Sequence, residues 1–177
     1  MASVWERLYD VPVTDTSSST PTGDSPRKDV AIAVIVRDGK VLVCQRPDRA
    51  SFAGYWEFPG GKREPGETVV ECLRREVNEE LALRVEPVHP LRPVDHDYPN
   101  GRIRLYPYVC TTENSVPRLL ACQDARWIDP RELKQYRFPP ANDTLLDEAI
   151  AYLTNRAGAG RALISERGRA TLPESGD

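Results

Sequence analysis

Three glutamates, Glu76, Glu79 and Glu80, lie close enough in the sequence to act together. In an α-helix, where each residue advances by about 100°, they fall within about 100° of arc. Like charges one turn apart, such as Glu76 and Glu80, oppose helix formation by a few tenths of a kcal/mol. The cluster has two interpretations: an acidic face exposed to solvent, or oxygen ligands for a hard divalent cation such as Mg²⁺.

Two adjacent glycines before the glutamates favour the metal interpretation. Gly60 and Gly61 belong to the run 56–62, which reads Trp-Glu-Phe-Pro-Gly-Gly-Lys. Adjacent glycines allow the backbone to approach other groups closely. Glu67 and Arg75 follow at fixed spacings, so the loop and the glutamates form one extended pattern.

The glutamates lie on a helix whose beginning is marked in the sequence. Thr68 and Glu71 form the Thr-x-x-Glu pattern of a capping box. Apolar residues then recur at spacings of three and four, which predicts a helix with one buried face. These residues are Val70, Leu73, Val77 and Leu81.

Strands and a second helix are expected around this helix. A β-branched run and a second apolar run flank an Asp-Gly pair, a pattern that predicts a hairpin. A last apolar pattern, starting near Asn142 or Asp143, predicts a helix that stops before Gly158. The expected strands are 30–36, 41–44, 102–110 and 126–128, and a loop rich in glycine and proline spans 47–66.

Composition and charge exclude several classes of protein. A chain of 177 residues favours one domain. The net charge of −3 argues against binding to long nucleic acid, which needs a basic surface. No apolar run approaches the roughly 18 residues of a membrane span, and the N-terminus lacks a signal pattern. We therefore expect a cytoplasmic protein without membrane contact.

The chain is expected to have a folded domain between two polar ends. Residues 1–28 are assigned to an N-terminal arm and a flexible linker rich in Ser, Thr and Pro. The folded domain is expected over 29–155 and a polar tail over 156–177. The cysteines form no Cys-x-x-Cys pair, so partly buried thiols are favoured over zinc ligands or disulfides. They are Cys44, Cys72, Cys110 and Cys122.

The segment from Gly61 to Leu83 resembles the Nudix box. That box reads Gly, five residues, Glu, seven residues, then Arg-Glu-apolar-x-Glu-Glu-x-Gly-apolar. The one departure is Ala82, which stands where the family usually has glycine. The resemblance covers roughly residues 29 to 155. It implies an α/β fold in which a mixed β-sheet is sandwiched between α-helices and the box forms a loop-helix-loop.

The resemblance also implies roles for individual residues. Glu76, Glu79 and Glu80 would hold Mg²⁺, or Mn²⁺ in its place, with the carbonyl oxygen of Gly60 as a further ligand. Glu67 and Arg75 would pair and brace the loop. The implied enzyme is a nucleotide pyrophosphohydrolase whose partner is a small nucleotide, acting as a monomer or homodimer.

Within the family, two stretches look like the MutT-like branch, which removes oxidised nucleotides. The first is 54–62, and the second is Phe-Pro-Pro-Ala-Asn at 138–142. Asn142 would read a purine edge, since an amide offers a donor and an acceptor in one plane; it could equally cap the last helix. Phe58 could stack on the base or lie in the core. Arg46 and Lys62 complete the expected substrate contacts.

The substrate class stays open. The expected reaction converts 8-oxo-dGTP to 8-oxo-dGMP and pyrophosphate, as part of nucleotide sanitation and DNA repair. A sister branch acts on CTP and other pyrimidine nucleotides, and the stretches Gln45-Arg46-Pro47 and Gly101-Arg102-Ile103 resemble it fairly well. A third reading is a nucleotide-sensing module that does not cleave. The branch often has an acidic ligand at the position of Ala121; here Asp124 is the nearest acid.

Overall fold

The central strand of the sheet is buried on both of its faces. In the computed structural model, which describes residues 27–99, 101–113 and 116–167 (156–167 for the backbone alone), this strand is β1 (Lys28–Arg37). Alternate side chains of β1 enter two separate hydrophobic cores, as period-two geometry requires. Val30, Ile32 and Val34 enter one core; Ala31, Ala33 and Ile35 enter the other.

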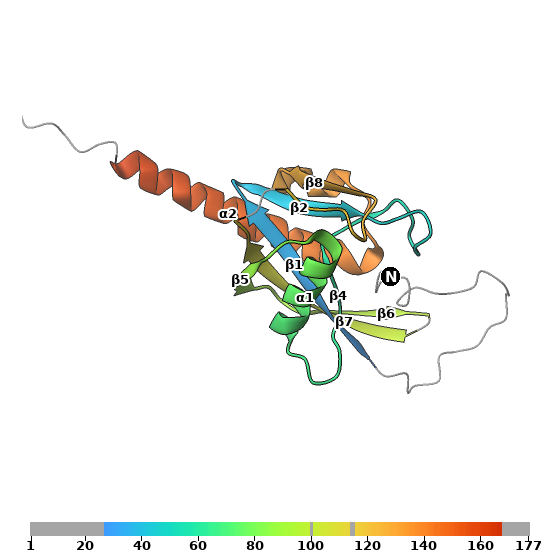
Figure 1. The fold of residues 1–177 in the computed structure, drawn as a ribbon. Helices are drawn as coiled ribbons and strands as arrows, with labels where there is room; N and C mark the ends of the chain where they lie inside the picture. Colours follow the sequence, from blue (N-terminus) through green and yellow to red (C-terminus); the bar gives the residue numbers. More distant parts are fainter. Residues whose placement is uncertain (1–26, 100, 114–115, 168–177) are drawn as a thin grey trace, which may run out of the picture.

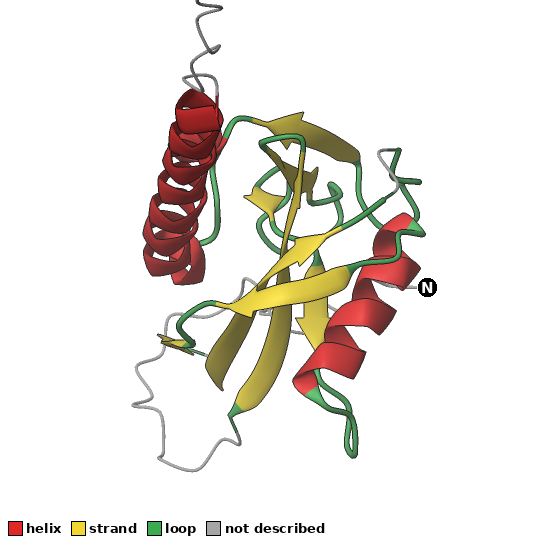
Figure 2. Ribbon diagram, turned by 90° about the vertical axis from the view of Figure 1, so that its left-hand side faces the viewer, coloured by secondary structure: helices red, strands yellow, loops and turns green. Residues whose placement is uncertain are grey.

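A helix covers each face of the sheet, and Figure 2 shows the three layers side-on. Leu73, Val77 and Leu81 of α1 (Val69–Leu81) pack in the core on one face. Leu145 and Ala149 of α2 (Asp143–Arg167) pack in the core on the other. The expected sandwich of a mixed sheet between helices is confirmed.

The sheet contains both parallel and antiparallel pairs. β1 runs parallel to β7 (Gly101–Thr111), and the other recorded pairs are antiparallel. The main path is β3-β2-β1-β7-β5, while β4 pairs with β1, β6 with β7 and β8 with β2. Figure 1 labels all of these strands except β3. The remaining strands are β2 (Lys40–Gln45), β3 (Trp56–Glu57), β4 (Gly60–Lys62), β5 (Glu86–Pro90), β6 (Val94–Tyr98) and β8 (Asp124–Ile128).

The predicted hairpin and strands are confirmed. Asp38 and Gly39 connect β1 to β2 with φ angles of 49° and 75°, the left-handed conformations that an Asp-Gly turn adopts. The strands expected at 102–110 and 126–128 correspond to β7 and β8.

The predicted end of the last helix is wrong. α2 continues through Gly158 to Arg167. A glycine inside a helix costs about 1 kcal/mol relative to alanine. Alanines at 157, 159 and 162 are strong helix formers, so the local sequence tolerates that cost. The N-terminal arm and the linker up to residue 26 lie outside the described residues.

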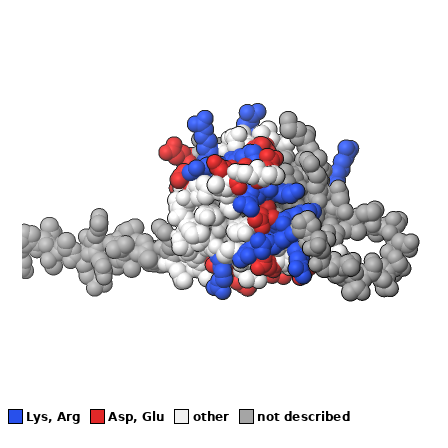
Figure 3. Space-filling model, turned by 90° about the horizontal axis from the view of Figure 1, so that it is seen from below, with Lys and Arg blue, Asp and Glu red and all other residues white. Residues whose placement is uncertain are grey.

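Basic and acidic side chains are interleaved on the surface. Figure 3 shows one face on which Lys and Arg gather with Asp and Glu between and around them. The β6–β7 hairpin illustrates the mixture, because Arg102 lies 3.5 Å from Asp97 and Arg104 lies 3.7 Å from Asp95. No helix among the described residues is both long and apolar enough to cross a bilayer.

Candidate active site

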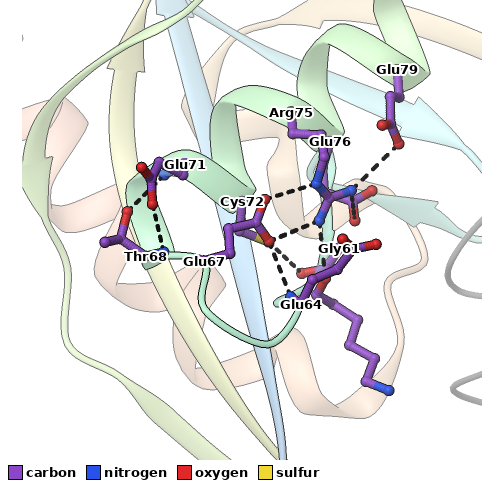
Figure 4. A network of polar contacts seen from close by, with 10 residues as sticks. Gly61, Glu64, Glu67, Thr68, Glu71, Cys72, Arg75, Glu76 and Glu79 are labelled. Carbon is purple, nitrogen blue, oxygen red and sulfur yellow. Dashed lines mark hydrogen bonds and ion pairs between the residues drawn. The ribbon is translucent and has the colours of Figure 1, made fainter.

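The helix α1 begins with the capping box that its sequence predicts. The Glu71 backbone N–H donates to Thr68 Oγ1 at 3.2 Å, and the Thr68 N–H donates to the Glu71 carboxylate at 2.8 Å. These reciprocal bonds satisfy backbone donors that a helix start leaves without partners. They fix the point at which the loop 63–68 turns into the helix (Figure 4).

Arg75 ties the loop to the helix. Its Nε and Nη2 donate to the two carboxylate oxygens of Glu67 at 2.8 and 3.0 Å, a bidentate pair. Its Nη1 donates to Glu76 at 2.8 Å and reaches Glu79 at 3.4 Å. Figure 4 shows the guanidinium among these carboxylates. The hydrogen bonds from Arg75 hold the pKa of Glu67 below its usual value.

Glu76 is buried against the backbone of Gly61. The residue is 1% exposed. A Cβ added to Gly61 would lie 2.3–2.5 Å from the Glu76 carboxylate, so glycine is needed there for the close approach anticipated from the sequence. Burial raises the pKa of Glu76, and the hydrogen bond from Arg75 opposes the rise.

Glu80 lies one turn further along α1 and is also buried. Its Oε2 accepts a hydrogen bond from the Gly60 N–H at 3.2 Å. Burial, followed by the nearby Glu57, raises the pKa of Glu80 well above its usual value. Glu79 differs from its two neighbours because its side chain is 56% exposed. Of the three predicted ligands, Glu76 and Glu80 are therefore buried and Glu79 is exposed.

Glu57 is a site residue that the sequence analysis missed. It lies in β3, is 8% exposed and forms an ion pair with the fully buried Arg46. Burial raises its pKa, and Arg46 opposes this. Its only sequence signal is a charged residue in an otherwise apolar run, Tyr-Trp-Glu-Phe-Pro. Arg46 also donates to the Ser51 carbonyl at 2.7 Å, which anchors the loop 47–55.

The chemistry of these carboxylates fits a divalent cation. Buried carboxylates are costly unless a cation offsets their charge, and Glu76, Glu80 and Glu57 are such groups. In the described part of the chain, no three His, Cys, Asp or Glu side chains surround a single point closely enough to hold a metal by themselves. Mg²⁺ does not require that, because it commonly takes one or two carboxylates and fills its shell with water and phosphate oxygens.

Of the other predicted substrate residues, Lys62 is exposed and Phe58 is buried in the core. Lys62 ends β4, is exposed, and its carbonyl accepts from Arg75 at 3.3 Å. Phe58 is 1% exposed in the core beneath α2, with its ring centroid 5.3 Å from that of Phe138. The ring is therefore a core residue in this structure, with no face open to a base.

Asn142 is 7% exposed at the end of the 3₁₀ helix η3 (Pro140–Asn142). The hydrogen bond recorded for its side chain, among the described residues, runs from Nδ2 to the Pro139 carbonyl at 3.4 Å. That contact lies within the turn and does not cap α2. The capping interpretation thus finds no support in the hydrogen bonds of the described residues.

The sequence departs from the Nudix pattern at Ala82 and in the loop before β8, and the structure places both. Ala82 ends α1 with a left-handed backbone, φ 53° and ψ 30°, the conformation for which glycine is favoured. Asp124 begins β8, and its carboxylate accepts from Arg126 Nε and from the Ala125 N–H, each at 2.8 Å. The loop before β8 carries Cys122, which packs against the core cluster that contains Cys44 and acts electrostatically on Glu80.

A cavity of about 820 Å³ lies elsewhere in the molecule. It is bounded by the β1–β2 turn, β5, β7 and α2, and its walls include Val36, Val109 and Tyr152. None of the glutamates of the predicted metal site lines it. The acidic side chains of the candidate site therefore lie on α1 and β3 and beside β4, and they do not line this cavity.

Comparisons with known proteins agree with this arrangement. A sequence model of the NUDIX domain matches residues 30–148. The chain is 33% identical over 123 residues to a CTP pyrophosphohydrolase of Escherichia coli, covering 70% of this chain and 91% of that protein. It is 37% identical over 89 residues to an 8-oxo-dGTP diphosphatase of Proteus vulgaris, covering 50% and 80%. The crystal structure of a MutT NUDIX hydrolase from Burkholderia pseudomallei superposes with a TM-score of 0.63 at 29% identity, covering 70% of this chain and 98% of that one.

Proposed function

The chain belongs to the Nudix family of hydrolases, and from that membership we propose that it is a metal-dependent nucleoside triphosphate pyrophosphohydrolase. The preferred substrate we propose is an oxidised purine nucleotide, 8-oxo-dGTP, which would yield 8-oxo-dGMP and pyrophosphate. We further propose a cytoplasmic monomer or homodimer whose active domain is 29–155.

One observation carries the proposal: a complete set of box carboxylates on one helix, two of them buried against a glycine pair. Glu76, Glu79, Glu80 and the Gly60 carbonyl oxygen would hold Mg²⁺, or Mn²⁺ in its place. When bound, the ion would neutralise phosphate charge and lower the pKa of an attacking water. A nucleotide-sensing module without activity would have no need of these ionisable groups in a buried position, so catalysis is favoured.

The chain's own residues would position the reacting groups. Arg75 fixes the side-chain oxygens of Glu67 and Glu76, so the loop and the helix move as one unit. Lys62, exposed beside this unit, would contact a phosphate oxygen. Arg46, which pairs with Glu57, also holds the loop 47–55 through the Ser51 carbonyl, and Glu57 acts electrostatically on Glu80.

The base preference is supported by Asn142. It lies in a buried turn that resembles the base-reading segment of the MutT-like branch, and its side-chain contact is a single long bond within that turn among the described residues. The similarity to the CTP pyrophosphohydrolase keeps a second candidate, hydrolysis of CTP or dCTP.

A nucleotide panel tests the proposal. The purified chain would be given 8-oxo-dGTP, dGTP, CTP and dCTP with Mg²⁺, and pyrophosphate release would be measured against a chelator control. We expect turnover only with metal and the highest kcat/KM for 8-oxo-dGTP. A preference for CTP or dCTP would assign the chain to the second candidate, and turnover in excess chelator would overturn the metal mechanism.

A further inference from the structure

Two thiols belong to one core cluster and lie within electrostatic range of Glu80. Cys44 is fully buried in β2, while Cys122 is partly buried in the loop before β8 and packs on the same core cluster. Cys122 is the largest influence on the Cys44 thiol and raises its pKa, in agreement with the packing of both side chains in one cluster. The backbones around them are held together because Cys44 pairs with Ala125 and the Gln123 N–H donates to the Gln45 carbonyl at 2.9 Å.

The other two cysteines have different surroundings. The Cys72 thiol donates to the Gly61 carbonyl at 3.5 Å. The Cys110 thiol lies on β7, where it donates to the Tyr108 carbonyl of the same strand at 3.5 Å. Of the four thiols, Cys44 and Cys122 are therefore the two that influence one another.

The loop that carries Cys122 is bonded to the end of the catalytic helix. The N–H groups of Leu120 and Ala121 donate to the Glu80 carbonyl at 3.0 and 3.3 Å. Cys122 is also close enough to the Glu80 carboxylate to affect its electrostatics. A displacement of this loop toward β2 would consequently shift Glu80.

We propose that Cys44 and Cys122 form a redox pair that closes to a disulfide beside Glu80 and thereby lowers turnover. The oxidant is a small-molecule disulfide, and the effect on turnover rests on the proposed function. Cys122 reacts first because Cys44 is enclosed. For the sulfur atoms to bond, the loop before β8 has to move, because β2 is held in the middle of the sheet.

The exchange balances in two steps. The Cys122 thiol loses its proton to solvent, and its sulfur attacks one sulfur of the small disulfide, releasing one small thiolate. The Cys44 sulfur, after losing its proton, attacks the Cys122 sulfur and releases the second thiolate. The two cysteines lose two electrons and two protons, and the small disulfide becomes two thiols.

Peptide mapping tests the pair without reference to activity. The folded full chain is incubated with oxidised glutathione, alkylated, and digested with trypsin without reduction. We expect a linked species of peptides 41–49 and 119–126, which hold Cys44 and Cys122 respectively. Folded protein that carries glutathione on Cys122 but no linked peptide would overturn the proposal.

Turnover under the same treatment tests the consequence. We expect a loss of roughly 10–100-fold, the usual range when groups supporting a metal ligand are disturbed, and recovery with dithiothreitol. Cys122→Ser should resist the loss, while the matched control Cys110→Ala should behave as the original chain. Linked protein with undiminished turnover would refute the regulatory part. If the reduced chain hydrolyses no nucleotide, the proposed function fails, while the mapping result still decides the thiol pairing.

Discussion

At the scale of single residues, Glu80 is a buried carboxylate whose negative charge is only weakly stabilised by its surroundings. Its carboxylate accepts from the Gly60 N–H at 3.2 Å, and Glu57 adds repulsion nearby. Glu80→Gln keeps the size and one acceptor oxygen but removes the charge. We expect turnover to fall at least about 100-fold, as when a key electrostatic group is removed, and thermal stability to be maintained.

The control for this change is Glu86→Gln, which alters an exposed glutamate whose contact is a surface ion pair with Arg74 at 2.8 Å. Surface pairs contribute about 0–1 kcal/mol, so its turnover should match the original chain. Kinetics with Mg²⁺ and 8-oxo-dGTP measure both variants. Near-normal turnover in Glu80→Gln would place the metal site elsewhere.

Asn142 tests substrate choice at the same scale. If its amide reads the base, Asn142→Ala should bring kcat/KM for 8-oxo-dGTP and dGTP closer together, because the lost bonds serve recognition. Loss of the 3.4 Å bond to Pro139 should cost no more than about 0.5–1.5 kcal/mol of folding free energy. Asn155→Ala, an exposed change on α2, is the control. Unchanged selectivity would remove Asn142 from base recognition.

At the scale of elements, the end of α1 carries an avoidable strain. Ala82 adopts a left-handed backbone, which costs a non-glycine residue roughly 1–2 kcal/mol. Glycine would remove this cost but lose about 0.5–1 kcal/mol through chain entropy. We expect Ala82→Gly to stabilise the fold by up to about 1 kcal/mol, measured by urea unfolding. Ala151→Gly, in the middle of α2, should destabilise it by about 1 kcal/mol; destabilisation by both changes would show that Ala82 is not strained.

Local signals in the sequence predicted some elements and not others. The capping box at Thr68 and the Asp-Gly turn at residue 38 carry their own hydrogen-bonding and backbone preferences, so both were correct. β5 and β6 were missed because Pro87, Pro90 and Pro93 interrupt any alternation there. These strands exist because β7 offers them partners, which is information from the tertiary structure.

In the candidate site, too, local features were predicted from the sequence and long-range contacts were not. The spacing of the box predicted the helix and its pairing with the loop, including the contact of Arg75 with Glu67. The spacing could not reveal Glu57, since its electrostatic effect on Glu80 depends on how β3 pairs with β2. The proximity of Cys44 and Cys122 is likewise long-range, set by the pairing of β2 with β8.

At the scale of the whole molecule, the buried carboxylates make stability depend on pH and on metal. Burial raises the pKa of Glu80, Glu76 and Glu57 above the usual 4.5. The folded state therefore holds protons that the unfolded state releases. The stability that these protonated carboxyls contribute is fully present below about pH 4.5, and it is lost as the pH rises through their raised pKa values in the folded state. Glu67, whose pKa is lowered, acts in the opposite direction but only below its usual value.

We accordingly expect the melting temperature of the metal-free chain to fall between about pH 5 and pH 8, the range above the unfolded carboxyl pKa. Saturating Mg²⁺ should restore it, because a ligand at 100 times its Kd adds about 2.7 kcal/mol. Glu80→Gln removes one of the titrating groups, so both its decline with pH and its gain from Mg²⁺ should be smaller. Thermal melts of both proteins in chelator and in Mg²⁺ across this range measure the effect. A melting temperature that rises steadily to pH 8 in chelator, equally in both proteins, would show that the carboxylates carry no such penalty.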